Sequence, residues 1–96
     1  MLVATPLLIA MIQKVNVPVK VLLKSDPDPK KTLPVRISWA NRIYDVKRVT
    51  FHHEKYEGRH LYHEFFVETN EIVMRLKFNS STLSWVLMEV TDYESD

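Results

Sequence analysis

The fold of this chain is decided by the hairpin sequence Trp39-Ala40-Asn41-Arg42-Ile43-Tyr44. Apolar residues alternate with polar ones over residues 35–39, and the alternation starts again at residues 44 and 46. Asn41 lies between the two runs and is one of the few non-glycine residue types that tolerate a left-handed backbone conformation. Alternation on both sides of such a residue predicts a β-hairpin with a tight or bulged turn.

The rest of the chain repeats this design. Alternating apolar residues predict further strands over residues 60–69, 72–78 and 83–90, with polar turn residues between them. Residues 15–24 predict an edge strand, because Pro18 has no N–H to donate to a neighbour. We therefore expect an all-β domain: an antiparallel meander of about six strands, strongly curled or closed to a half-open barrel.

Residues 1–12 are apolar and uncharged, but a membrane-spanning helix needs about 20 such residues. Thr5-Pro6 is typical of a helix start, which predicts a short helix over residues 6–14 or an extra strand, docked on the sheet. Its candidate interaction residues are Leu7, Leu8, Met11 and Ile12. The alternative is that Met11 is the true start. The expected organisation is an apolar segment over residues 1–14, one β domain over 15–92 and an acidic tail over 93–96.

Composition excludes several classes of function. The chain has no cysteine, which removes thiolate nucleophiles and most zinc-finger layouts, and its single glycine excludes Gly-rich phosphate loops. The 13 basic side chains all lie in residues 1–88 with 8 of the 12 acidic ones, so this part carries a charge of +5. That excess is too small to indicate nucleic-acid binding by itself. We expect a cytoplasmic protein without a cofactor.

The hairpin and the C-terminal strand resemble a short bacterial domain family of unknown function. The matching elements are Trp39, Asn41-Arg42, Tyr44 and Val46 against a W-x-G-R-x-Y-x-V pattern, and a W-x-L … D ending in Trp85, Leu87 and Asp92. Asn41 replaces the family's glycine, as a left-handed turn position permits. The resemblance implies a fold and a bacterial origin, but no activity.

Four histidines with nearby glutamates suggest a metal site, since imidazole and carboxylate are common zinc ligands. Strand geometry limits this set, because residues an odd number apart point to opposite faces. His53 and His63 are the best remaining pair, and we predict that they share one face and are half-buried residues without a metal. We expect no enzyme, because a small meander with a filled core offers little room for catalysis. The side chains expected to fill this core are Trp39, Phe51, Phe65, Phe78 and Trp85.

Two binding functions remain open. The first is protein interaction or self-association, through the apolar N-terminus and an edge strand that accepts a partner. The alternative is single-stranded nucleic acid on a basic and aromatic sheet face. Its candidate residues are Arg42, Tyr44, Lys47, Arg48, Tyr62, Arg75 and Lys77. The sequence indicates neither a membrane nor a small-molecule substrate.

Overall fold

A two-residue turn joins the strands on either side of Asn41. In the computed structural model, which describes residues 12–28 and 31–92, Trp39 pairs with Arg42, and both Ala40 and Asn41 have positive φ angles, of 54° and 63°. Positive φ at both central residues is the requirement of a type I′ turn, whose twist matches that of the flanking strands. The predicted hairpin is confirmed.

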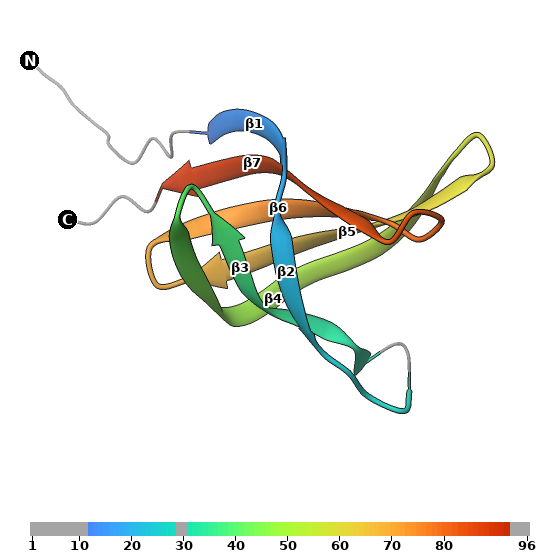
Figure 1. Cartoon of the computed structure of the whole chain (residues 1–96), viewed down its shortest axis with the longest axis horizontal. Helices are drawn as coiled ribbons and strands as arrows, with labels where there is room; N and C mark the ends of the chain where they lie inside the picture. The colour runs from blue at the N-terminus through green and yellow to red at the C-terminus, as the bar shows by residue number, and fades with distance from the viewer. Residues whose placement is uncertain (1–11, 29–30, 93–96) are drawn as a thin grey trace, which may run out of the picture.

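Seven strands make up one antiparallel sheet in the order β1-β7-β6-β5-β4-β3-β2 (Figure 1). The strands are β1 Ile12–Pro18, β2 Lys20–Lys24, β3 Leu33–Trp39, β4 Arg42–Glu57, β5 His60–Thr69, β6 Ile72–Asn79 and β7 Ser84–Asp92. The predicted strand over residues 15–24 is two strands, because the chain leaves one neighbour and joins another at Val19. The described residues contain no helix: Ile12 to Lys14, part of the predicted helix, lie in β1, and residues 6–11 lie outside the described range.

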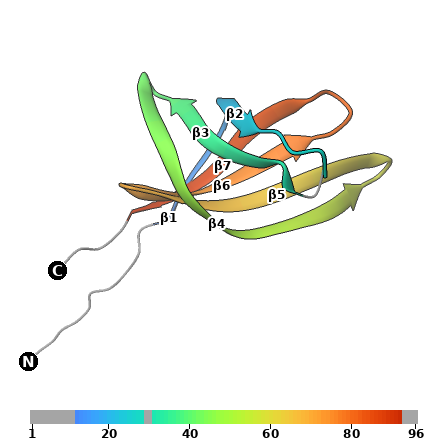
Figure 2. The ribbon, with the colours of Figure 1, turned by 90° about the horizontal axis from the view of Figure 1, so that it is seen from below.

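The two end strands of the sheet, β1 and β2, are consecutive in the chain, so the sheet must curl to bring its ends together. β1 pairs with β7 and β2 pairs with β3, yet only Val19 separates β1 from β2. The backbone N–H of Val19 donates to the carbonyl of Trp85 at 3.2 Å, which holds this junction against β7. Seen from below, β2 and β3 arch over the sheet formed by β4 to β7 (Figure 2). The all-β half-barrel predicted from the sequence is confirmed.

The longest strand, β4, contains two β-bulges. Its pairing with β5 shifts between Val46 and Arg48 and again between Val49 and Phe51, so that Lys47 and Thr50 are extra residues. A bulge bends a strand and reverses the faces of the side chains that follow it. The bulges bend β4 from its pairing with β3 towards its pairing with β5. The bulge at Thr50 also turns His52, and not His53, to the concave side, opposite the buried Phe65.

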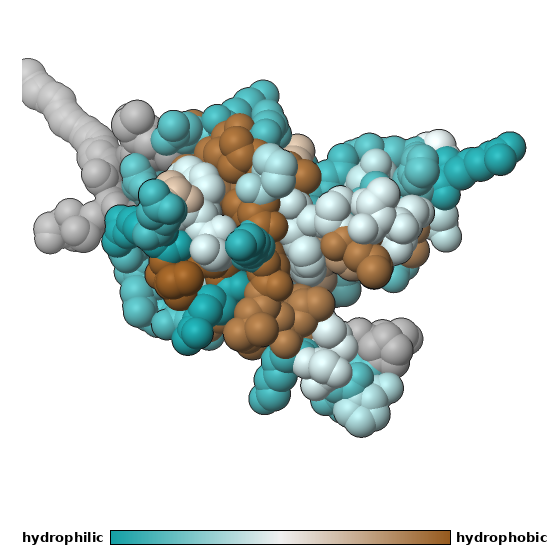
Figure 3. All heavy atoms as spheres, in the orientation of Figure 1, coloured by the Kyte–Doolittle hydropathy of each residue, from teal (hydrophilic) through white to brown (hydrophobic). Residues whose placement is uncertain are grey.

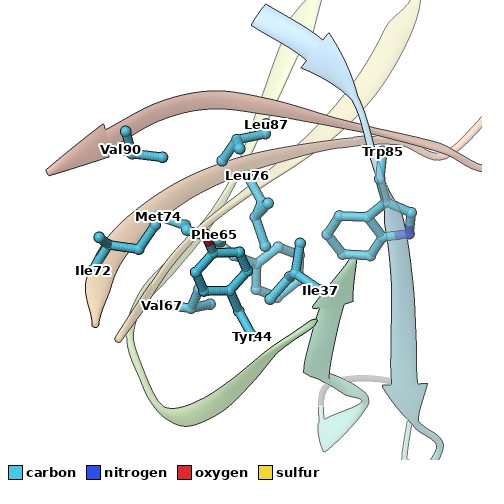
Figure 4. Close-up of a cluster of buried hydrophobic side chains, with 10 residues drawn as sticks. All are labelled: Ile37, Tyr44, Phe65, Val67, Ile72, Met74, Leu76, Trp85, Leu87 and Val90. Carbon is cyan, nitrogen blue, oxygen red and sulfur yellow. The ribbon is translucent and has the colours of Figure 1, made fainter. Parts of the chain in front are cut away.

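The core fills the concave side of the half-barrel (Figure 4). It consists of Ile37, Tyr44, Phe65, Val67, Ile72, Met74, Leu76, Trp85, Leu87 and Val90. The predicted faces of β5 and β6 are confirmed, since Phe65, Met74 and Leu76 are all buried. Phe51 was expected in the core but is 53% exposed, because the bulge at Thr50 turns it to the convex side. In β7, a bulge between Leu87 and Glu89 lets both Leu87 and Val90 face inward.

Candidate functional site

The end strand β2 has one unpaired edge. Among the strands that the structure describes, only β3 pairs with it. Its side chains alternate: Val21 lies opposite the buried Ile37, whereas Leu22 lies opposite the exposed Arg36. Leu22 is 56% exposed and Leu23 is 37% exposed. The space-filling view shows apolar side chains at the surface where β2 crosses the front of the molecule (Figure 3).

A pocket of about 270 Å³ lies beside this strand. It is lined by Leu23 and Thr32 from the β2–β3 side, His52 and His63 from the β4–β5 hairpin, and Phe65, Phe78 and Trp85 from the sheet. The pocket forms because β2 diverges from β7 after Val19, leaving the concave face uncovered beyond the main core. Its surface is mostly apolar and aromatic, and the polar groups of its lining residues are two imidazoles, one hydroxyl and the indole N–H of Trp85. Mainly apolar walls with a few fixed polar groups are typical of ligand sites.

The aromatic rings of the pocket pack on one another. The Phe78 and Trp85 ring centroids are 4.7 Å apart, and those of Phe65 and Trp85 are 5.4 Å apart. The imidazole of His52 stacks on Phe65 at 4.2 Å with the planes nearly parallel. Because each ring is held by another, the pocket wall is preorganised. A ligand could therefore displace solvent from the pocket without rearranging these side chains.

His52 and His63 form the polar rim of the pocket. His52 Nε2 lies 3.0 Å from His63 Nδ1, which is hydrogen-bonding distance. Burial lowers the pKa of His52, the adjacent His63 lowers it further, and Glu54 opposes the shift. The predicted pairing of His53 with His63 on one face is wrong. The two-residue turn at Gly58-Arg59 pairs Glu57 with His60, and the regular register back from this turn places His52 opposite Phe65 and His53 opposite Glu64. Within residues 12–28 and 31–92, no three His, Asp or Glu side chains gather closely enough to hold a metal ion.

His53 belongs instead to an ion-pair network on the convex face. Its Nε2 lies 2.7 Å from the carboxylate of Glu64, and Arg75 reaches Glu64 at 3.1 Å and Glu89 at 3.2 Å. Glu64 is only 5% exposed. Burial by itself would raise the pKa of Glu64, but hydrogen bonds from His53 and Arg75 outweigh it and hold the pKa below its ordinary value. This network explains how a buried carboxylate is tolerated outside the core.

Carboxylates pair with most of the basic residues predicted to bind nucleic acid. Besides Arg75, Arg42 donates to Glu71, Arg48 to Glu68 and Lys77 to Glu57. Lys77 also lies 4.2 Å from the Tyr62 ring centroid. Tyr44 is only 6% exposed and contributes to the core, so its ring offers no open face to a base. Lys47 is exposed in a bulge and has no ion-pair partner within the described residues.

Of the predicted N-terminal interaction residues, the structure describes only Ile12. It begins β1 opposite Thr91 and is 65% exposed. Leu7, Leu8 and Met11 lie outside the described residues.

Sequence reasoning missed the exposed leucines of β2 and the pocket beside them. A signal was present, since two consecutive leucines between Lys20 and Lys24 break the alternation of an edge strand. Such a pair places one apolar side chain on each face of the strand. The pocket could not be predicted without knowing which strands lie side by side.

In the part of the chain that the structure describes, no helix is long and apolar enough to cross a membrane. We compared the chain with models of protein families, with curated proteins and with solved structures. No match was found in any of the three comparisons.

Proposed function

We propose that this chain is a non-catalytic protein-binding module that captures an extended segment of a partner along the unpaired edge of β2. The observation that carries the proposal is the position of β2 at the end of the strand order with Leu22 and Leu23 exposed. An unpaired strand edge offers backbone N–H and C=O groups that an extended peptide can satisfy. Alternate side chains of the added strand then provide specificity.

The edge of β1 is less suited to this role. Its pairing with β7 is irregular between Lys14 and Val17, and Asn16 has a φ of 52°. Pro18 removes one backbone donor. Irregularity and proline are two of the ways in which proteins block strand addition at an edge. In the pairing of β2 with β3, the extra residue is Val35 of β3, so β2 itself is regular.

Charge favours an acidic partner over a second copy of the chain. Residues 12–24 contain three lysines and no acidic residue. Lys20 and Lys24 flank the apolar part of β2, and neither has an ion-pair partner among the described residues. Two copies paired antiparallel about Leu22 would set Lys20 of each opposite Lys24 of the other. Like charges directly opposite one another destabilise a strand pair, whereas Asp or Glu at these positions in a partner would stabilise it.

The ion pairs of the basic residues also favour a protein partner over single-stranded nucleic acid. A protein that binds phosphates needs cations that are free to replace the counterions of the nucleic acid. Arg42, Arg48, Arg75 and Lys77 each already contact a carboxylate. Breaking these contacts would oppose binding to phosphate.

A peptide-display selection tests the proposal. A library of random ten-residue peptides is panned against the full-length chain, and the enriched peptides are synthesised and titrated by fluorescence anisotropy. We expect enriched sequences with alternating apolar residues between acidic ones, and slowed amide hydrogen exchange in β2 when they bind. Selected peptides that protect other strands and leave β2 unchanged would overturn the proposal, as would a selection without enrichment.

Charge reversal supplies a matched control. The double variant Lys20→Glu/Lys24→Glu is expected to bind the selected peptides about tenfold more weakly, since each exposed charge pair contributes up to about 1 kcal/mol. Lys14→Glu/Lys55→Glu makes the same change in net charge on other strands and should leave binding unchanged. An equal loss of affinity in both double variants would mean that the net charge of the chain, and not Lys20 and Lys24, determines binding. Salt-sensitive binding of short single-stranded DNA or RNA, with no peptide binding, would replace the proposal by the nucleic-acid alternative.

A further inference from the structure

We infer that the pocket beside β2 receives one aromatic side chain of the partner strand, and that this side chain is Trp or Tyr. The inference rests on the proposed capture of a strand by β2. It adds the identity of the anchoring residue, which the exposed edge alone does not determine.

The position of Leu23 links the strand edge to the pocket. Leu23 is a residue of β2 and also lines the pocket, on the same side as Val21, which faces the core opposite Ile37. Side chains of paired strands that lie side by side point to the same face of a sheet. A partner residue next to Leu23 therefore points to the concave side, about 4.8 Å further from β3. That direction leads towards the rings of Phe78 and Trp85.

The size of the pocket fits one aromatic ring system. An apolar cavity of about 150 Å³ is large enough for benzene. The pocket measures about 270 Å³ and is open on one side, so it has room for a phenol or an indole ring. Its walls present ring faces and edges of Phe65, Phe78 and Trp85, whose tilted contacts are of the kind that aromatic groups prefer.

The histidine pair selects a ring that also carries a hydrogen-bonding group. In the neutral pair, one imidazole donates its proton across the 3.0 Å contact between His52 Nε2 and His63 Nδ1. The two outer nitrogens, His52 Nδ1 and His63 Nε2, then carry one N–H donor and one acceptor, whichever imidazole is the donor. The rim can therefore accept the N–H of an indole, or exchange a hydrogen bond with a phenol. A phenylalanine ring would leave these nitrogens without that partner.

Two substitutions in adjacent residues test the inference. Leu23→Trp places an indole in the pocket from β2 itself, whereas Leu22→Trp adds the same side chain on the opposite face of the same strand. The probe is a selected acidic peptide, synthesised with Trp, Tyr, Phe, Leu or Ala at the position next to Leu23 and titrated by fluorescence anisotropy. Circular dichroism and amide NMR spectra of both variants establish that they fold.

For the wild-type chain we expect Trp and Tyr peptides to bind at least tenfold more tightly than the Ala peptide, with Phe and Leu between them. Leu23→Trp should bind all five peptides about as weakly as the wild type binds the Ala peptide, and Leu22→Trp should keep the wild-type order. If Leu23→Trp fails to fold, His63→Ala takes its place. His63→Ala should bind the Trp and Tyr peptides no more tightly than the Phe peptide, but still more tightly than the Ala peptide.

The failure of this inference can be distinguished from the failure of strand capture. Peptides that bind along β2 with equal affinity whatever their anchor residue would overturn the inference and leave strand capture standing. A titration with N-acetyl-tryptophanamide, followed through the NMR signals of Trp85 and Phe78, examines the pocket without a strand. If this probe binds the pocket while no peptide binds β2, both the strand capture and the anchor are wrong, and the pocket is a site for free aromatic compounds. If neither probe binds, both proposals are overturned.

Discussion

The backbone N–H of Val19 donates to the carbonyl of Trp85 at 3.2 Å, and this bond marks the place where the half-barrel opens. Before it, β1 runs along β7; after it, β2 leaves β7 and pairs with β3. One change of neighbour therefore produces both the unpaired edge of β2 and the uncovered pocket at Trp85. This common origin explains why an exposed strand and an aromatic pocket lie together.

The first prediction concerns the core. Leu76 in β6 is fully buried, so Leu76→Ala should lower the free energy of unfolding by about 2–5 kcal/mol, through lost apolar burial and the cavity left behind. Leu22→Ala removes the same atoms from an exposed strand face and should cost less than about 1 kcal/mol. Urea unfolding measures both. A similar loss in the two variants would contradict the assignment of the concave face as the core.

The second prediction concerns Glu64 on the convex face. Glu64→Gln removes the charge that accepts hydrogen bonds from His53 and Arg75, so it should lower the free energy of unfolding by about 1–3 kcal/mol near neutral pH. Glu68→Gln, whose partner Arg48 is largely exposed, should cost less than about 1 kcal/mol.

The effect of Glu64→Gln should depend on pH. The pKa of Glu64 is lower in the folded chain than in the unfolded one, so its contribution is complete above the unfolded value of 4.5 and declines as the pH falls through the folded value. Urea unfolding at neutral and acidic pH should show the difference between wild type and variant shrinking below pH 4.5. A difference that is constant with pH would contradict the assignment.

The third prediction concerns the histidine pair. NMR titration should place the pKa of His52 below 6.5. His63→Gln should raise the pKa of His52 only part of the way, because burial is the larger cause of the shift. Glu54→Gln should lower the pKa further, because the carboxylate of Glu54 favours the protonated form.

The same shift should affect stability. The unfolded chain binds a proton at His52 near pH 6.5 while the folded chain still excludes it, so stability should rise with pH between the lowered folded value and 6.5. His52→Gln should remove this part of the pH dependence. If the free energy of unfolding of His52→Gln depends on pH as it does in the wild type, groups other than His52 cause the dependence.

Local patterns in the sequence were sufficient to predict the strands but not their register. Alternation correctly assigned the faces of β5 and β6, because neither strand contains a bulge within its pairing. In β4, the odd spacing of Val46 and Val49 matches the bulge at Lys47, but the bulge at Thr50 left no mark, because Val49 and Phe51 keep the alternation. The extra residue Thr50 therefore moved Phe51 out of the core, and the two-residue turn at Gly58-Arg59 placed His52 instead of His53 beside His63. A bulge is determined by the bend that tertiary packing imposes, which a single strand does not encode.

The candidate site was harder to predict than the fold for a related reason. The pocket residues come from β2, β4, β5, β6 and β7 and from the loop that holds Thr32, and they meet only because the sheet curls. The basic residues were recognised as a group, but their partners Glu57, Glu68 and Glu71 lie 20 to 29 positions away in the chain. Neutralisation by distant carboxylates depends on the register of the strands, which the sequence did not reveal.

The last prediction returns to the turn between β3 and β4. Asn41 tolerates its φ of 63°, but Ala40 has a φ of 54°, where a β-carbon costs about 1–2 kcal/mol. Changing Ala40-Asn41 to Asn-Gly gives the pair preferred in type I′ turns and should raise the free energy of unfolding by about 1 kcal/mol. Gly58→Ala is the opposite test: Gly58 has a φ of 63° and open space around an added β-carbon, so any loss of stability comes from the backbone alone. Thermal unfolding should show a gain in the first variant and a loss of about 1 kcal/mol in the second. A loss in both would mean that Ala40 makes a contact that outweighs its backbone strain.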